Sequence, residues 1–447
     1  MKKTLTAAAC ICAAAVSFFA ASCSSKSGSA KSSGPVTIKY ELWDSAQLPA
    51  YQKCAEVFMG KNPDIKIEIT QLGWNDYWTG LQTEMVGGSA SDVFTDHLAK
   101  FKEFSNKGQL VDLAPYIKRD NVDTSIYLNG LEKLWQTEDG KCYGLPKDWD
   151  TIAIVYNADA LKKAGFTEEE ANSLTWNAED GGTFEKFIAK LSIDSQGRNG
   201  LDPKFDKKNV VQYGFALNHS DDRGQAQFSP FAVSTGWMYT DGLYDHNYHY
   251  DDQRFIDTIK WMHQMELKGF AAPFADTANG ANTLLFSGKA ATLLDGSWMI
   301  GTYVSNGAIP VGFALLPTGP KGRRSMTNGL ADSIWAGSKH HEEAWQWVKF
   351  LASEEAQKIV GSYGVVFPAI QGGVDAALKT YSDKGINVKA FTDEAAEPGC
   401  TFVYPVLDNA TKVNEIMTRT FDKIFLGEEK EDAALKTANA EVKALYN

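Results

Sequence analysis

The sequence predicts an α/β protein built on a mostly parallel, doubly wound sheet. Residues 36–43 (VTIKYELW) and 65–72 (IKIEITQL) alternate apolar and polar side chains, as half-buried strands do. A helical stretch follows each of them, and a short apolar strand, 92–95 (DVFT), completes a βαβαβ order with short turns. The 447 residues, 44% of them apolar, suffice for a large core and for two or more domains.

The helices between these strands have recognisable ends. The first is expected at about 46–60, closed by Gly60 and a KNPD turn, and the second covers 77–88 and ends in two glycines. Ligands of doubly wound sheets bind beyond the carboxyl ends of the strands. The side chains that follow the strands are therefore candidates for a site: Trp43, Asp44, Trp74, Asp96 and His97.

The stretch 142–157 (CYGLPKDWDTIAIVYN) combines a strand with a cluster of polar residues. Its second half, Thr151 to Tyr156, has the apolar, β-rich composition of a buried strand. Two carboxylates, an ammonium and an indole directly precede that strand. They are compatible with a solvated loop and with a binding site. These four residues are Lys147, Asp148, Trp149 and Asp150.

The second half of the chain again mixes helices and strands. A strand at 290–300 is expected to end in a turn at 295–298. The polar segment 194–210 faintly resembles a calcium loop, but it lacks the required oxygen ligands and the closing Glu, so we interpret it as a surface excursion, and a metal-binding loop is the alternative. Amphipathic or helix-forming patterns predict helices at 183–192, 254–270, 342–360 and 431–446.

The N-terminus has the features of a targeting segment. Lys2 and Lys3 precede an apolar run, and small residues lead to Cys23, which resembles the bacterial lipobox with Ala20 at the position where Leu is usual. The Ser/Gly/Lys-rich residues after Cys23 have the composition of a flexible tether. We expect a signal peptide at 1–22 and a lipidated Cys23 with its tether at 23–35; ordinary cleavage without a lipid is the alternative.

Charge and cysteine content exclude several classes of protein. The net charge of −12, without clustered cations, argues against nucleic acid as a partner. Beyond the N-terminus only Cys54, Cys142 and Cys400 remain; they form no disulfide framework, allow at most one bridge, and are interpreted as small buried residues. The common hydrolase, zinc-protease and nucleotide-binding motifs are absent from the sequence. A glycosidase carboxylate pair stays open, because only geometry reveals one.

Seven segments in order resemble extracellular solute-binding protein family 1, the maltose-binding-protein-like lipoproteins of sugar ABC importers. They span about 36–360, and one departure is Ser91, where the family often has Pro. The segments are NPDIKIEI, WNDYWTGLQTEMVGGSASDVF, GQLVDLAPYI, YGLPKDWDTIAIVYNADALKKAGF, FSGKAATLLDGSWM, VGFALLPTGP and EEAWQWVKFLASEEAQ.

The resemblance implies a periplasmic-binding-protein-like fold: two α/β lobes, a hinge and a ligand cleft between them. The expected lobes are 36–150 plus 311–360 and 151–310 plus 361–447, with 151–156 crossing between them. The implied function is capture of a mono- or oligosaccharide by hinge closure and its delivery to membrane permease subunits driven by a cytoplasmic ATPase. We expect an exported, membrane-anchored monomer without a cofactor; the alternative is an exported glycoside-cleaving enzyme.

Sugars explain which residue types to look for. Indoles cover the C–H faces of a pyranose, and carboxylates accept hydrogen bonds from its hydroxyls. Trp298 matches a ring-stacking position of the family, whereas Trp74 can equally cap the core, Asp96 can cap a helix, and Lys147 and His97 are expected at the rim or in structural roles. The predicted ligand-binding residues are Asp44, Asp96, Asp150 and Asp332 for hydroxyls, and Trp43, Trp74, Trp237, Trp298 and Trp335 for ring faces.

Overall fold

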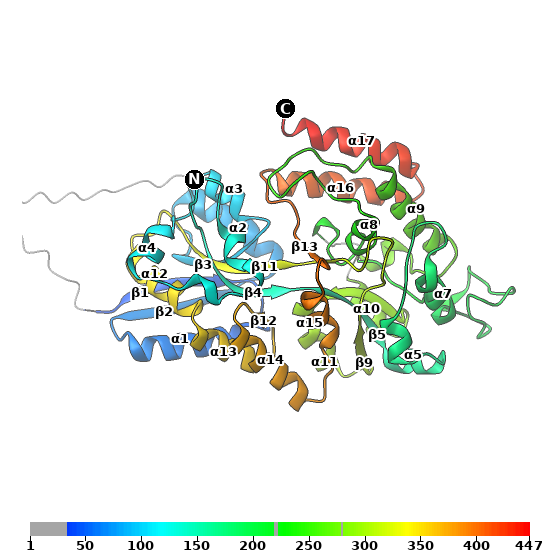
Figure 1. Cartoon of the computed structure of the whole chain (residues 1–447), viewed down its shortest axis with the longest axis horizontal. Helices are drawn as coiled ribbons and strands as arrows, with labels where there is room; N and C mark the ends of the chain where they lie inside the picture. The colour runs from blue at the N-terminus through cyan, green and yellow to red at the C-terminus, as the bar shows by residue number, and fades with distance from the viewer. Residues whose placement is uncertain (1–33, 219–221, 279) are drawn as a thin grey trace, which may run out of the picture. The chain divides into compact units, whose positions relative to one another are not determined.

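The computed structural model describes residues 34–218, 222–278 and 280–447 (Figure 1). The predicted signal peptide, Cys23 and nearly all of the tether lie outside the described residues. Within the described part, no helix combines the length and the apolar character needed to cross a bilayer.

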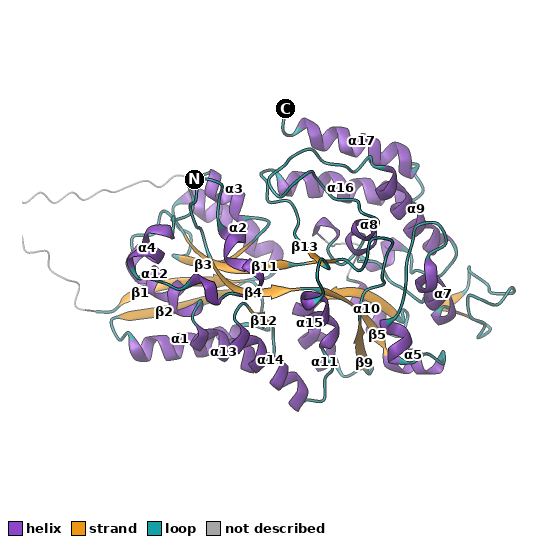
Figure 2. Ribbon diagram, in the orientation of Figure 1, coloured by secondary structure: helices purple, strands orange, loops and turns teal. Residues whose placement is uncertain are grey.

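A six-stranded sheet combines four strands from the first 150 residues with two from later in the chain (Figure 2). The first three strands pair in parallel around β1, as the βαβαβ pattern predicts, but β11 runs antiparallel to both of its neighbours, so the sheet is mixed and the prediction of a mostly parallel sheet is wrong. In spatial order the strands are β12 (Phe367–Pro368), β4 (Leu145–Asp150), β11 (Asn328–Ile334), β3 (Val93–His97), β1 (Val36–Leu42) and β2 (Ile65–Gln71).

Apolar side chains cover both faces of this sheet. Ile38, Tyr40 and Leu42 alternate along β1 and enter one core cluster, while Phe94 of β3 faces a second cluster that contains Tyr77. The helices around the sheet are α1 (Leu48–Lys61), α2 (Trp74–Gly87), α3 (Phe101–Asn106), α4 (Ala114–Arg119), α12 (His341–Leu351), α13 (Glu354–Tyr363) and α14 (Gln371–Asp383).

The predicted helix at 342–360 is in fact two helices. The Ser353 hydroxyl accepts a hydrogen bond from the backbone N–H of Ala356, which caps the start of α13 after α12 has ended at Leu351. Trp345 and Trp347 of α12 are fully buried in the core.

A three-stranded antiparallel sheet organises the second part. The strand order is β8 (Thr292–Gly296), β5 (Ile152–Asn157) and β9 (Val311–Ala314). Ile152, Ile154 and Tyr156 face one core cluster, and the residues between them face the other side of the sheet. The helices of this part are α5 (Ala158–Lys163), α6 (Glu168–Asn172), α7 (Gly182–Leu191), α8 (Ser229–Ser234), α9 (Gln253–Leu267), α10 (Ala281–Phe286), α11 (Ile300–Asn306), α15 (Lys389–Ala396), α16 (Ala410–Phe425) and α17 (Glu431–Ala444).

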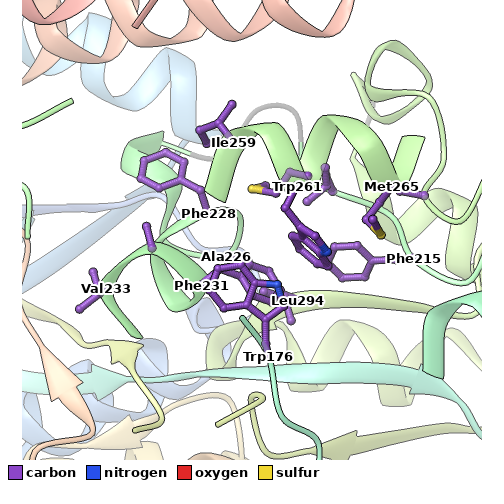
Figure 3. Close-up of a cluster of buried hydrophobic side chains, with 14 of the residues drawn as sticks. Trp176, Phe215, Ala226, Phe228, Phe231, Val233, Ile259, Trp261, Met265 and Leu294 are labelled. Atoms are coloured by element: carbon purple, nitrogen blue, oxygen red, sulfur yellow. The ribbon is translucent and has the colours of Figure 1, made fainter. Parts of the chain in front are cut away.

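Aromatic side chains fill the core beside this sheet (Figure 3). The Trp176 ring lies 5.1 Å from that of Phe231 and 5.3 Å from that of Trp261, between centroids. Ala226 belongs to the same cluster and also lines the large cavity described below. The cavity wall on this side is therefore backed by close-packed aromatic residues.

The two sheets are connected by very short segments of chain. Thr151 alone separates β4 from β5, and its hydroxyl donates to the Phe391 carbonyl at 2.8 Å. The return segment contains β10 (Ser325–Met326), where the Ser325 hydroxyl accepts from the backbone N–H of Ile152 at 2.8 Å. Beside it, β13 (Thr401–Phe402) pairs with β10. The segment 194–210 is bounded by a small hairpin, β6 (Ile193–Asp194) and β7 (Val210–Gln212).

Strand pairing does not follow the expected lobe boundaries at 310/311 and 360/361. Strand β9 lies after the first boundary but pairs with β5 of the three-stranded sheet, and β12 lies after the second but pairs with β4 of the six-stranded sheet. In both cases the chain passes between the sheets later than expected. The sequence around each boundary carries no break in its pattern, so it does not indicate where the chain crosses.

We predict that Glu394, on α15, makes the stability of the protein depend on pH. This side chain is fully buried, its Oε1 accepts from the backbone N–H of Leu316 at 2.7 Å, and desolvation raises its pKa to about 8. An unfolded Glu ionises at about pH 4.3, so between that pH and about pH 8 the unfolded state loses its proton while the folded state keeps it. The stability contributed by neutral Glu394 is therefore present at low pH and lost as the pH rises through this window.

Melting curves of the wild type and of Glu394→Gln at pH values from 5 to 9 test this effect. The glutamine has no proton to lose, so the melting temperature of the variant, relative to the wild type, should increase with pH. A difference that stays constant over the whole range would contradict the prediction.

Candidate functional site

A cavity of about 510 Å³ lies where the ends of both sheets meet. From the six-stranded sheet it is lined by the chain after β1, the end of β4 and the start of β11. From the other side it is lined by the turn after β8 and by the chain just before α8. The lining residues that carry polar or aromatic groups include Trp43, Asp44, Trp74, His97, Asp148, Asp150, Asn218, Arg223, Gln225, Asn282, Asp295, Trp298 and Asn328.

Five predicted ligand-binding residues line this cavity: Trp43, Asp44, Trp74, Asp150 and Trp298. The rule that ligands bind beyond the carboxyl ends of strands accounts for the first two, because β1 ends at Leu42. His97, expected at the rim or in a structural role, also lines the cavity.

Two predicted tryptophans lie in the core and do not line the cavity. Trp237 is fully buried, its ring stacks on Phe255 at 4.5 Å, and its indole N–H donates to the His249 carbonyl at 2.8 Å. Trp335 packs in the same core cluster as Phe94, behind the sheet. The expectation that either covers a sugar ring is therefore corrected.

Two predicted aspartates are likewise buried inside the protein. Asp96 is fully buried and accepts hydrogen bonds from the His97 N–H at 2.8 Å and the Ser333 hydroxyl at 3.1 Å; desolvation raises its pKa to about 7. Asp332 forms an ion pair with Lys147 at 3.1 Å, and both side chains are only 2% exposed. Neither residue lines the cavity.

The Lys147 ammonium lies in a closed network below the cavity. It is 2.9 Å from the hydroxyls of both Tyr40 and Thr95, and 4.0 Å from the centre of the Tyr51 ring. The Tyr40 hydroxyl also donates to Asp332 at 2.8 Å. This network satisfies a buried cation and a buried anion together, so it is part of the sheet and not of the cavity surface.

Strand β4 explains the cluster of polar residues at 147–150, which is not a solvated loop. Trp149 packs in a core cluster and stacks on Phe367 at 5.0 Å, and it also lines the cavity, as Asp148 and Asp150 do. Asp150 Oδ1 accepts from Gln225 Nε2 at 2.8 Å and from the Asn328 backbone N–H at 2.9 Å. Desolvation raises the pKa of Asp150 well above its usual value, and the neighbouring Asp148 raises it further.

Aromatic rings form one wall of the cavity. The Trp43 and Trp74 rings meet edge to face at 5.1 Å, and the His97 ring lies 5.7 Å from that of Trp74. Trp74 begins α2 and is 38% exposed, which leaves part of its ring open to a ligand. Desolvation lowers the pKa of His97 well below its usual value, so its imidazole is neutral at pH 7.

The turn after β8 places Trp298 in the part of the cavity wall that the three-stranded sheet contributes. Asp295 holds this turn, since its carboxylate accepts from the Tyr303 hydroxyl at 2.5 Å and the Gly296 N–H at 2.9 Å. Gly296 leaves the space that the indole occupies, because a Cβ at this position would lie 1.9 Å from the Trp298 ring.

Several lining residues were not identified from the sequence. Asn218, Arg223, Gln225 and Asn282 come from loops or helix starts without a periodic pattern. Arg223 is the only Lys or Arg among the described lining residues, and it adopts a left-handed conformation with φ 67°. A single Arg-Gly pair gives no signal by which sequence reasoning can find it.

Comparisons with known proteins place the chain in a family. The family model described as bacterial extracellular solute-binding protein matches residues 43–358. The maltodextrin-binding protein MdxE of Bacillus subtilis is 23% identical over 76% of this chain and 75% of its own length. The galactooligosaccharide-binding protein of the same organism is 23% identical over 97% of this chain and 96% of its own.

Solved structures share the fold. UspC from M. tuberculosis superposes with a TM-score of 0.73 and 26% identity, covering 92% of this chain and all of its own. Lmo0181 from Listeria monocytogenes, an ABC substrate-binding protein in complex with cycloalternan, superposes with a TM-score of 0.79 and 21% identity, covering 92% and 99%. The protein thus has the expected fold of two α/β lobes with a hinge and a ligand cleft. Since the family match covers well over half of its length, the chain belongs to the bacterial extracellular solute-binding proteins.

Proposed function

We propose that this protein is the substrate-binding component of an ABC importer and that it captures a saccharide in the cavity between its lobes. The observation that supports this most directly is the combination of open indole faces and buried carboxylates around one 510 Å³ space. The family match, and relatives named for maltodextrin and galactooligosaccharide, point to the same ligand class.

The wall chemistry suits a sugar better than an apolar or anionic ligand. Trp43, Trp74 and Trp298 offer ring faces to the C–H face of a pyranose, and Asp148 and Asp150 offer acceptors to its hydroxyls. Binding in the micromolar range needs about 8 kcal/mol net. A few charge-assisted hydrogen bonds at about 1.5–3 kcal/mol each, with one or two stacked rings, are sufficient.

We assign the lobes from strand pairing as 36–150 plus 328–383 and 152–326 plus 389–447. Asp150 and Trp43 then belong to the first lobe, and Trp298 and Gln225 to the second. A ligand that contacts both lobes stabilises a closed arrangement, because the two sets of contacts coexist only there. The closed form is the one that we expect permease subunits with a cytoplasmic ATPase to recognise.

The N-terminus supports an exported, anchored protein. We propose that Cys23 carries the lipid and that 24–35 acts as a tether at the outer face of the cytoplasmic membrane. We further propose that the protein acts as a monomer and releases its ligand chemically unchanged.

A thermal-shift screen with product analysis tests the function. The panel contains maltotriose, galactobiose, arabinotriose, lactose and mannotriose, and each sample is afterwards chromatographed for cleavage products. We expect at least one saccharide to raise the melting temperature by mass action, without products. Cleavage would favour the glycosidase alternative, and a panel without any shift would contradict saccharide binding.

A further inference from the structure

One carboxylate oxygen in the cavity wall has no internal hydrogen-bond donor. The Asp148 side chain is only 4% exposed, and its Oδ1 accepts from the Leu330 backbone N–H at 3.1 Å. Its Oδ2 is buried and has no hydrogen-bond partner among the described residues. Since nearly all buried polar atoms in proteins are paired, such an oxygen requires an explanation.

The neighbouring donors are engaged elsewhere. Lys147 points to the opposite face of β4, where it is bound to Asp332. Gln225 donates its amide to Asp150. The other two acidic side chains of the cavity, Asp44 and Asp295, are satisfied on both oxygens by their own turns. Asp148 therefore differs from these two in keeping a buried acceptor unfilled.

Burial makes this oxygen costly in the unliganded protein. Desolvation raises the pKa of Asp148 to about 7, with Lys147 acting in the opposite direction. An unfilled buried acceptor destabilises the protein that carries it, and a ligand that fills it removes the cost. The cavity is the space that this side chain lines, so the missing donor can come from a bound molecule.

We propose that Asp148 is a specificity-determining residue of the saccharide site, whose Oδ2 accepts a hydrogen bond from a ligand hydroxyl or amino group and repels a ligand carboxylate or phosphate at that position. This inference rests on the proposed function and adds to it the residue that selects neutral or amino sugars over acidic ones. Asp150, two residues away on the same strand, also lines the cavity.

Asp148→Asn separates a binding role from a structural one. The asparagine can keep the acceptor for Leu330 N–H, but it places an NH₂ group, which cannot accept, where Oδ2 was. We therefore expect the unliganded variant to melt at or above the wild-type temperature and to bind at least tenfold more weakly. Affinity is measured by calorimetry with the panel saccharide, such as maltotriose or mannotriose, that gives the largest thermal shift.

Asp194→Asn is the matched control. Asp194 is also buried but does not line the cavity, and its carboxylate accepts from Gln196 N–H, Arg198 N–H and Nε, and Asp206 N–H. The same substitution there should lower the melting temperature and leave affinity unchanged. Asp148→Ser, which is shorter but polar, is the second variant if the asparagine variant does not fold.

Derivatives of the probe distinguish the ligand classes. In these derivatives a uronic acid replaces one ring at a time, and at least one of them should bind the wild type at least tenfold more weakly than the neutral sugar does. In Asp148→Asn this difference in affinity between the acidic and the neutral sugar should be smaller. An amino derivative should bind the wild type as well as the neutral sugar or better. Wild-type affinity in Asp148→Asn would overturn this inference alone. Failure of every saccharide to bind the wild type would instead overturn the proposed function, and this inference with it.

Discussion

Replacing Lys147 with Met is expected to lower the free energy of unfolding by about 3–5 kcal/mol. Met keeps most of the side-chain volume but removes the cation that pairs with the Asp332 carboxylate, which is 2% exposed. Removing one partner of a buried ion pair leaves the other charge buried and uncompensated, and this is the costly change. Urea unfolding, monitored by the fluorescence of the many tryptophans, measures the difference.

Two further variants show whether burial is the cause. Lys379→Met removes one partner of an exposed pair with Asp383 on α14, and it should cost less than about 1 kcal/mol. Combining Lys147→Met with Asp332→Leu should recover much of the lost stability, because no buried charge then remains. Equal losses for Lys147→Met and Lys379→Met would refute the role of the buried pair.

Replacing Gly296 with Ala is expected to weaken saccharide binding about 30-fold or more. The new Cβ would lie 1.9 Å from the Trp298 ring, so the indole must leave the position in which it lines the cavity. Loss of an aromatic anchor in a binding site costs about 2 kcal/mol or more, which corresponds to that change in affinity. Trp298→Ala should give a loss of similar size in the same calorimetric titration.

Gly301→Ala provides the control for this substitution. Gly301 lies in α11, a few residues beyond Trp298, and a Cβ there has no atom within 4 Å among the described residues. The saccharide affinity of the Gly301→Ala variant should equal that of the wild type. If Gly296→Ala also bound the saccharide normally, the proposed stacking of Trp298 on the ligand would be wrong.

Much of the fold follows from local patterns in the sequence. Alternation along 36–43 and 65–72 predicts β1 and β2, because one face of each strand is buried and the other is not. Strand β4 was missed for the opposite reason: both of its faces are covered, and one of them buries Lys147. That lysine is tolerated only because Asp332, 185 residues away in sequence, supplies its counter-charge. No local pattern contains that information.

The site could be predicted only where it follows the ends of strands. Trp43, Asp44 and Asp150 come directly after or at the end of strands of the six-stranded sheet, so topology places them at the cavity. Trp237 is the same type of residue, but its indole N–H donates to the carbonyl of His249 and its ring lies in the core. Composition does not distinguish these cases, because the direction of a side chain depends on packing partners that are distant in sequence.

The single residue between β4 and β5 has a consequence for how ligand binding changes the shape of the protein. Any change of angle between the sheets pivots within one residue of Asp150, and atoms beside a pivot move least. The two carboxylates of β4 thus contribute nearly the same binding energy at every angle. The turn that carries Trp298 is tied to the same residue, because the Ser297 backbone N–H donates to the Thr151 carbonyl at 3.0 Å. The contacts that discriminate between angles, and that set how strongly ligand occupancy is converted into closure, are therefore those that lie farther from Thr151.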